Sequence, residues 1–243
     1  MDLEFIRRAT KVTSFNLTAS DFTTTRYKNE IKHIFETHLV PELGDIDYSN
    51  SVDVSLNSKI AVLRQSPNFI NLYNYKKIEG VGPGEVMLFL LIQDARLGGA
   101  GSAGKDLIVG STGYEIKAAS ISGDKKYATQ VFTGGTVKEI PFIITEMQKL
   151  AKIMNITISG SEISPNTLKA MKERAPDQYI AIEKQYGIAV GKYFAGHSTI
   201  FMNNAGGRQF FGSIAAIKEV KPSDIAIYQI TRGNIKPRVN INA

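Results

Sequence analysis

The amino-acid sequence predicts an α/β protein, and three observations lead to that class. Residues 137–154 repeat apolar side chains at helical spacing. Segments 198–202, 209–220 and 224–231 alternate apolar and polar residues, as half-buried strands do. Residues 106–118 hold two short apolar runs around a glycine-rich turn, which is the pattern of a β-hairpin.

The first part of the chain predicts a mixture of helices and extended segments. Apolar residues at helical spacing predict a helix over Arg26–Leu39. A short strand is expected at Val52–Val54 within a polar, turn-rich stretch. For Lys59–Leu63 and Asn68–Tyr75 the pattern leaves helix and strand open.

The middle of the chain leads into the hairpin. A helix is expected over Glu85–Leu97, after the loop at Gly80–Gly84. Gly98–Gly104 is rich in small residues, but it lacks the Gly-Lys-Ser/Thr ending of a phosphate-binding loop and predicts a flexible connection. After the hairpin, a turn is expected at Ser122–Lys126 and a strand at Tyr127–Phe132.

Two further helices and a C-terminal sheet complete the prediction. Ser164 followed by Pro165 is a favourable helix start, so helices are expected over Asn166–Arg174 and Asp177–Phe194. The alternating segments that follow predict an antiparallel sheet. We therefore expect one compact unit with four regions. These are a mixed N-terminal extension (residues 1–79), a core (80–160), a helical insertion (161–196) and a C-terminal β region (197–243).

Composition narrows the class of protein. The chain contains no cysteine, which excludes disulfides and thiolate zinc sites. Its net charge of +6 is moderately basic and compatible with a polyanionic partner. The first residues lack the pattern of a secretory signal, and the longest apolar run, Val86–Ile92, is too short to cross a bilayer. We expect a soluble protein without a membrane partner. The three histidines lie far apart in the sequence and predict no metal cluster.

Four residues around the hairpin form a candidate active site. Asp106 opens the first hairpin strand, and Glu115 and Lys117 lie on the returning strand, where alternation directs both side chains to one face. Carboxylates at this spacing suit a hard divalent cation such as Mg²⁺, and a nearby amine can help to orient water and balance charge. Glu85, at a helix start, can reach the same metal or water from the opposite side.

On these residues the chain resembles the PD-(D/E)xK nuclease superfamily, whose fold is restriction-endonuclease-like. The match covers about residues 80–150. It implies a core of a helix, a central mixed β-sheet and a second helix. It also implies that Asp106, Glu115, the Ile116 carbonyl and Glu85 hold Mg²⁺, with Mn²⁺ as a substitute, while Lys117 assists the attacking water. The chain departs from the motif at Lys105, where the family often has proline.

The resemblance implies Mg²⁺-dependent hydrolysis of DNA phosphodiester bonds, by an endonuclease of restriction, repair, recombination or phage and mobile-element DNA processing. It also implies that the protein binds DNA and can form a homodimer. The location that it implies is the cytoplasm of a bacterial or phage-infected cell, or a virion. Basic residues in predicted turns or in the basic C-terminal region are candidate phosphate contacts: Lys125, Lys126, Arg208 and Arg232. Gln130 is a weaker candidate for supporting the site.

Two alternatives remain open. The acid-x-Lys tripeptide at Glu115–Lys117 is common in charged chains, so the hairpin can be structural with ordinary surface charges. The fold can also belong to a non-catalytic nucleic-acid-binding protein or a structural assembly protein, such as a virion component. The intact set of two acids and a lysine favours the enzyme.

Overall fold

The computed structural model describes most of the chain beyond residue 50. The described residues are 51–65, 82–92, 95–97, 105–129, 131, 137–158, 162–203 and 212–242. Predictions for Arg26–Leu39, Asn68–Tyr75, Gly98–Gly104, Gln130 and Arg208 lie outside them. The chain divides into two compact units, Met1–Ile116 with Met202–Ile214, and Lys117–Phe201 with Ala215–Ala243.

The first unit begins its described part with a capped helix. The strand expected at residues 52–54 is wrong, because the Asp53 carboxylate accepts a hydrogen bond from the Ser55 N–H (2.7 Å) and starts the 3₁₀ helix η2 (Val54–Leu56). The chain continues as α4 (Asn57–Gln65). Lys59–Leu63, for which the sequence allowed either a helix or a strand, is therefore helical.

The next helix, α6 (Pro83–Leu91), confirms the predicted helix but starts two residues before Glu85 and ends earlier than expected. Pro83 occupies the first turn, where its missing N–H costs nothing. The expected extension to Leu97 is wrong, because the chain becomes extended at Ile92 and forms the strand β1 (Ala95–Leu97), which pairs antiparallel with β2. Strand pairing here overrides a helical pattern of apolar residues, and α6 packs against β1 and β2.

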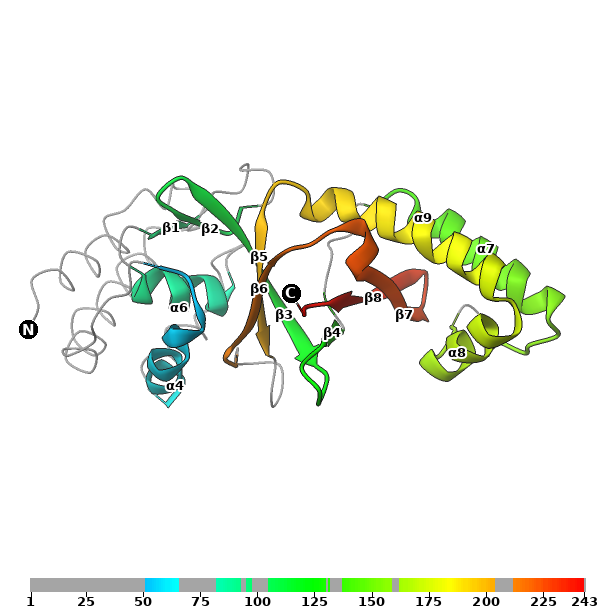
Figure 1. Cartoon of the computed structure of the whole chain (residues 1–243), viewed down its shortest axis with the longest axis horizontal. Helices are drawn as coiled ribbons and strands as arrows, with labels where there is room; N and C mark the ends of the chain where they lie inside the picture. Colours follow the sequence, from blue (N-terminus) through cyan, green and yellow to red (C-terminus); the bar gives the residue numbers. More distant parts are fainter. Residues whose placement is uncertain are drawn as a thin grey trace, which may run out of the picture. The chain divides into compact units, whose positions relative to one another are not determined.

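The predicted hairpin is confirmed (Figure 1). β2 (Leu107–Val109) pairs antiparallel with β3 (Thr112–Ile121) through the two-residue turn Gly110-Ser111, in which Gly110 has a positive φ of 59°. β3 is longer than expected. Its first half belongs to the first unit, and its end pairs in the second unit with β4 (Tyr127–Thr129).

The turn between β3 and β4 is confirmed at residues 122–126. The Asp124 carboxylate accepts hydrogen bonds from the Ser122 hydroxyl (2.6 Å) and the Lys126 N–H (3.1 Å). These bonds hold the pKa of Asp124 below its usual value, because they stabilise the charged carboxylate. Lys125 takes a positive φ of 57° at the tip of this turn.

Three helices dominate the second unit. The helix predicted over 137–154 is confirmed as α7 (Ile140–Ile153). The predicted helix start at Ser164 is also confirmed, because its hydroxyl accepts a hydrogen bond from the Thr167 N–H (3.1 Å) at the beginning of α8 (Pro165–Arg174). α9 (Pro176–Phe194) follows directly.

The strands after α9 pair in an order that the sequence did not reveal. β5 (Ser198–Asn203) pairs with β3 and with β6 (Ile214–Glu219), while β7 (Ile225–Thr231) pairs antiparallel with β8 (Asn234–Asn240). The sequence did not predict β8, because it contains Pro237. The ladder order is β1-β2-β3-β4-β8-β7, and helices together with this sheet confirm the α/β class.

The core of the second unit lies between the helices and the β7–β8 hairpin. α7 and α9 lie side by side, and α9 also contacts α8 and β7 (Figure 1). Apolar residues of all three helices and both strands form one buried cluster. Gly187 and Gly191 let Pro222 approach α9, since a Cβ at Gly187 would stand 2.5 Å from the Pro222 carbonyl oxygen. Among the described residues, no helix has both the length and the apolarity to cross a membrane.

Candidate active site

The register of the β2–β3 hairpin brings two predicted acids together. Leu107 is the partner of Tyr114, so the next step of an antiparallel ladder puts Asp106 opposite Glu115. The Asp106 N–H continues the pairing by donating to the Tyr114 carbonyl (2.9 Å). Opposite residues of such a pair have Cβ atoms about 5 Å apart on one face of the sheet. The hairpin therefore brings Asp106 next to the part of β3 that carries Glu115.

The Asp106 side chain is oriented by the backbone of β3. Its Oδ2 accepts a hydrogen bond from the Ile116 N–H (2.8 Å), in the place that a further residue of β2 would otherwise fill. In antiparallel pairs the N–H and C=O of one residue face the same neighbouring strand. The Ile116 carbonyl is therefore directed to the edge where Asp106 lies, as its predicted ligand role requires.

Glu115 is a buried acid, since only 3% of its surface is exposed. Two carboxylates in opposite positions of a ladder repel each other, and burial strengthens the repulsion. Carboxylate oxygens are also the ligands that a hard divalent cation prefers. The donor chemistry fits Mg²⁺, which takes hard oxygen ligands and retains water in its remaining positions.

Lys105 precedes Asp106 and lies beside the hairpin. Its aliphatic stem passes over Gly113 on β3, where a Cβ would stand 2.6 Å from the lysine Cδ. Glycine at position 113 thus leaves room for Lys105 next to Asp106.

The structure assigns Glu85 a capping contact. Its Oε1 accepts a hydrogen bond from the Gly82 N–H (2.9 Å), so the carboxylate closes the first turn of α6. Among the described residues, no three His, Asp or Glu side chains gather into a metal-binding group. The role of Glu85 as a metal ligand therefore stays a prediction, and the acids that the register brings together are Asp106 and Glu115.

Lys117 follows two residues after Glu115 on β3 and has a partner that the sequence did not reveal. Its Nζ donates to the Tyr193 hydroxyl (2.7 Å) and lies 5.0 Å from the centre of the same ring. Both side chains are half-buried. Tyr193 comes from the last turn of α9, 76 residues further along the chain, so no local pattern could link it to the tripeptide. It holds the amine in a defined position.

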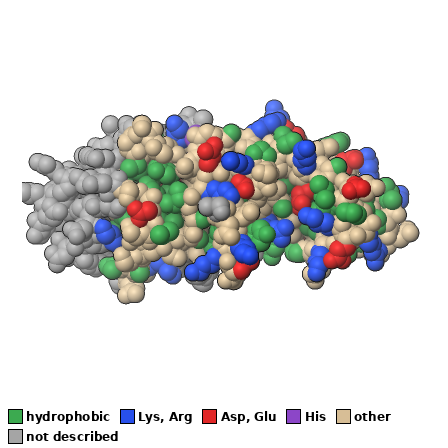
Figure 2. Space-filling view, in the orientation of Figure 1, with side chains coloured by type: hydrophobic (Ala, Val, Ile, Leu, Met, Phe, Trp, Pro, Cys, Tyr) green, Lys and Arg blue, Asp and Glu red, His purple; other side chains and the backbone are tan. Residues whose placement is uncertain are grey.

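The described candidates for phosphate contacts lie in turns of the second unit. Lys125 and Lys126 are exposed between β3 and β4. Arg232, 92% exposed between β7 and β8, lies 3.7 Å from a Glu162 carboxylate oxygen. Figure 2 shows Lys and Arg side chains scattered among acidic and apolar ones on the described part of the face drawn. Lys125, Lys126 and Arg232 are exposed and accessible to a polyanion.

Comparisons with known protein families, with curated proteins and with solved structures find no match for this chain. The candidate site is therefore described by its own geometry and chemistry.

Proposed function

We propose that the chain is a Mg²⁺-dependent nuclease that hydrolyses DNA phosphodiester bonds as an endonuclease. The observation that carries the proposal is the opposition of Asp106 and Glu115 across the hairpin, one step beyond the Leu107–Tyr114 pair.

Asp106, Glu115 and the Ile116 carbonyl would hold the metal, with Glu85 as an accessory ligand. Mg²⁺ bound there would polarise a phosphodiester oxygen and lower the pKa of a water molecule. The hydrogen bond between Ile116 and Asp106 fixes the orientation of the carboxylate before any ligand arrives. Preorganisation of this kind reduces the reorganisation that binding and catalysis require.

Lys117 would help to orient the attacking water and balance the negative charge of the transition state. Its hydrogen bond to Tyr193 restricts a side chain that otherwise samples many rotamers. We treat Tyr193 as a positioning residue, since it acts through Lys117.

The order of elements supports a restriction-endonuclease-like core: α6, then the β2–β3 hairpin with its acids, then α7. DNA is the substrate that this resemblance implies, in restriction, repair, recombination or mobile-element processing. Exposed Lys125, Lys126 and Arg232 are candidate phosphate contacts in the second unit.

The test is cleavage of supercoiled and linear plasmid by the wild type and by Lys117→Ala, each with Mg²⁺, with Mn²⁺ and with EDTA. We expect metal-dependent nicking of the circle by the wild type. Loss of one group that acts in proton transfer or charge balance is expected to slow cleavage about a hundredfold or more. Retention of the circular dichroism spectrum and melting temperature excludes misfolding as the cause.

Lys149→Gln is the matched control, because Lys149 is an exposed lysine of α7 whose ion pair with Glu146 lies outside the site. It should cut like the wild type. Absence of cutting by the wild type with either metal, across circular, linear and single-stranded DNA, would refute the nuclease and favour the non-catalytic alternative.

A further inference from the structure

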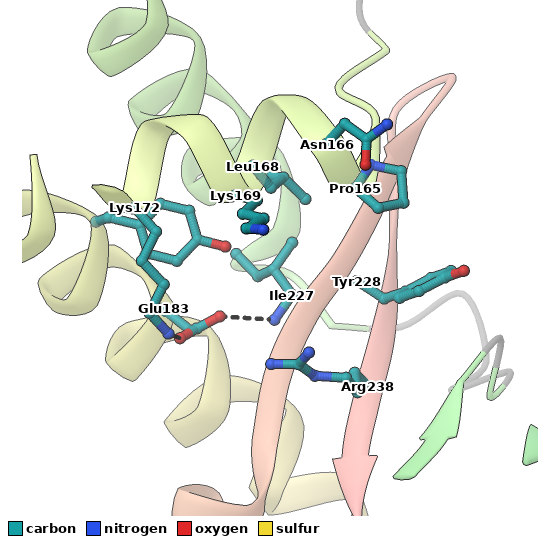
Figure 3. Close-up of a pocket in the computed structure, with 10 residues that line it drawn as sticks. Pro165, Asn166, Leu168, Lys169, Lys172, Glu183, Ile227, Tyr228 and Arg238 are labelled. Carbon is teal, nitrogen blue, oxygen red and sulfur yellow. Dashed lines mark hydrogen bonds and ion pairs between the residues drawn. The ribbon is translucent and has the colours of Figure 1, made fainter. Parts of the chain in front are cut away.

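A second charged site lies wholly within the second unit. A pocket of about 280 Å³ opens between α8, α9, β7 and β8 (Figure 3). Its size is near the lower end of small-molecule sites, which span about 300–1,000 Å³. Pro165 and Asn166 line one end of the pocket in Figure 3, and Arg238 lines the other.

Cations outnumber acids on the wall of this pocket. Lys169 and Lys172 come from α8 and Arg238 comes from β8, against the single carboxylate of Glu183. Lys169 is mobile enough to meet a ligand, because its side chain is 77% exposed and its ion pair with Glu173 is long (3.9 Å). The pocket therefore carries an excess of positive charge.

The one acid in the wall is already engaged by the protein. Glu183 Oε1 accepts a hydrogen bond from the Ile227 N–H (3.1 Å), and Oε2 pairs with Lys172 (3.1 Å). Tyr179 also bonds to this carboxylate, and burial together with the negative charge of Glu183 raises the pKa of the Tyr179 phenol. The phenol stays protonated and can donate. These partners compensate the charge of Glu183, which lowers its repulsion of an entering anion.

Arg238 supplies the strongest indication of a ligand. Its guanidinium carbon lies 4.7 Å from the centre of the Tyr127 ring, which orients the group. Figure 3 shows the guanidinium directed from β8 toward the side of Glu183. Its Nε is buried and has no hydrogen-bond partner among the described residues. Arg238 as a whole is half-buried and lines the pocket, so an oxyanion there can accept hydrogen bonds from its guanidinium, which binds such groups in a bidentate manner.

We propose that this pocket binds a phosphate group, free or carried by a small molecule, with Arg238 as the principal contact and Lys169 and Lys172 as supporting charges. The pocket has room for a phosphate with a small organic part, whereas a long polymer cannot be enclosed in it. A free phosphate and a mononucleotide share this chemistry. The proposal is independent of the nuclease, because it uses none of the residues of the hairpin.

The test uses the full-length chain with three probes: inorganic phosphate, adenosine 5′-monophosphate and adenosine. Binding is followed by isothermal titration and by amide NMR shifts of α8, α9, β7 and β8. We expect both phosphate probes to bind, to move signals of pocket residues and to bind more weakly as salt rises. Adenosine should leave those signals unchanged. Tighter binding of the nucleotide than of phosphate identifies a nucleotide as the ligand, whereas equal affinities identify the free phosphate.

Arg238→Gln should weaken phosphate binding about tenfold or more, as expected for loss of a charged hydrogen bond. Lys169→Glu reverses an exposed charge without disturbing the core, so it keeps the test valid if Arg238→Gln folds poorly; it should weaken binding several-fold. Lys149→Gln, outside the pocket, should bind like the wild type. The proposal is refuted if neither phosphate probe binds, if adenosine binds as well as the nucleotide, or if both pocket variants bind normally.

Discussion

Asp106 in the first unit and Asp224 in the second are two aspartates in similar local settings. Each accepts a backbone hydrogen bond through Oδ2, from Ile116 at 2.8 Å and from Lys221 at 2.9 Å respectively. They differ in what stands across from them. Asp224 Oδ1 pairs with Lys218 at 3.0 Å, whereas Asp106 lies one residue beyond the last pair of the β2–β3 ladder, next to the part of β3 that carries Glu115.

The difference separates a structural carboxylate from a candidate functional one. Lys218 also donates to the carbonyls of Asn240 (3.2 Å) and Asn242 (3.0 Å), so its bond with Asp224 ties the end of the chain to the turn before β7. Stability alone explains that arrangement. Asp106 and Glu115 are instead the two acids of the metal site that we propose, since carboxylate oxygens are the ligands that Mg²⁺ prefers.

The largest expected effect comes from Asp106→Asn, which removes the charge and nearly keeps the shape. We expect cleavage to fall about a hundredfold or more, because a metal ligand is weakened. Without metal, the melting temperature should stay nearly the same, since an asparagine oxygen can still accept the hydrogen bond from the Ile116 N–H. Differential scanning calorimetry with and without Mg²⁺ provides a readout besides activity: the metal should raise the wild-type melting temperature and not that of the variant. A variant that is strongly destabilised without metal would make Asp106 a structural residue like Asp224.

Asp224→Asn is the matched counterpart and should show the opposite profile. Loss of a charged hydrogen bond in a mostly buried pair should lower the free energy of unfolding by about 1–3 kcal/mol. Cleavage per folded molecule should remain at the wild-type level, because Asp224 takes no part in the proposed site. Urea titration and plasmid cleavage at a temperature well below the melting transition check both parts. Loss of cleavage in a fully folded Asp224→Asn sample would contradict the assignment of Asp224 as a purely structural residue.

The smallest effect is expected from Tyr193→Phe, which keeps the ring and removes the hydroxyl. Lys117 then loses the 2.7 Å bond that restricts its amine. We expect cleavage to slow about three- to tenfold, with a shifted pH–rate profile and unchanged affinity for DNA. Single-turnover rates across a range of pH values test this. A wild-type rate and profile would show that Tyr193 does not position Lys117.

Local signals in the sequence were sufficient for several elements. The turn at Gly110, the helix start at Ser164 and the apolar face of α7 were predicted correctly, since each depends on neighbouring residues. Errors arose where distant parts of the chain compete with local preference. The predicted helix ends before Leu97 because residues 95–97 pair with β2 and form β1. The sequence did not predict β8 because it contains Pro237, which its pairing with β7 accommodates.

For the candidate site, the sequence by itself determined the acids, the lysine and the alternation that puts Glu115 and Lys117 on one face of a strand. Only the tertiary structure decided that Asp106 bonds to Ile116, that Tyr193 holds Lys117 and that Arg238 lines a pocket with α8. The physical reason is the distance along the chain between the residues that interact. Turns, caps and strand alternation depend on a few adjacent residues, whereas the partners of Lys117 and Arg238 come from segments far away in the chain, which only folding brings into contact.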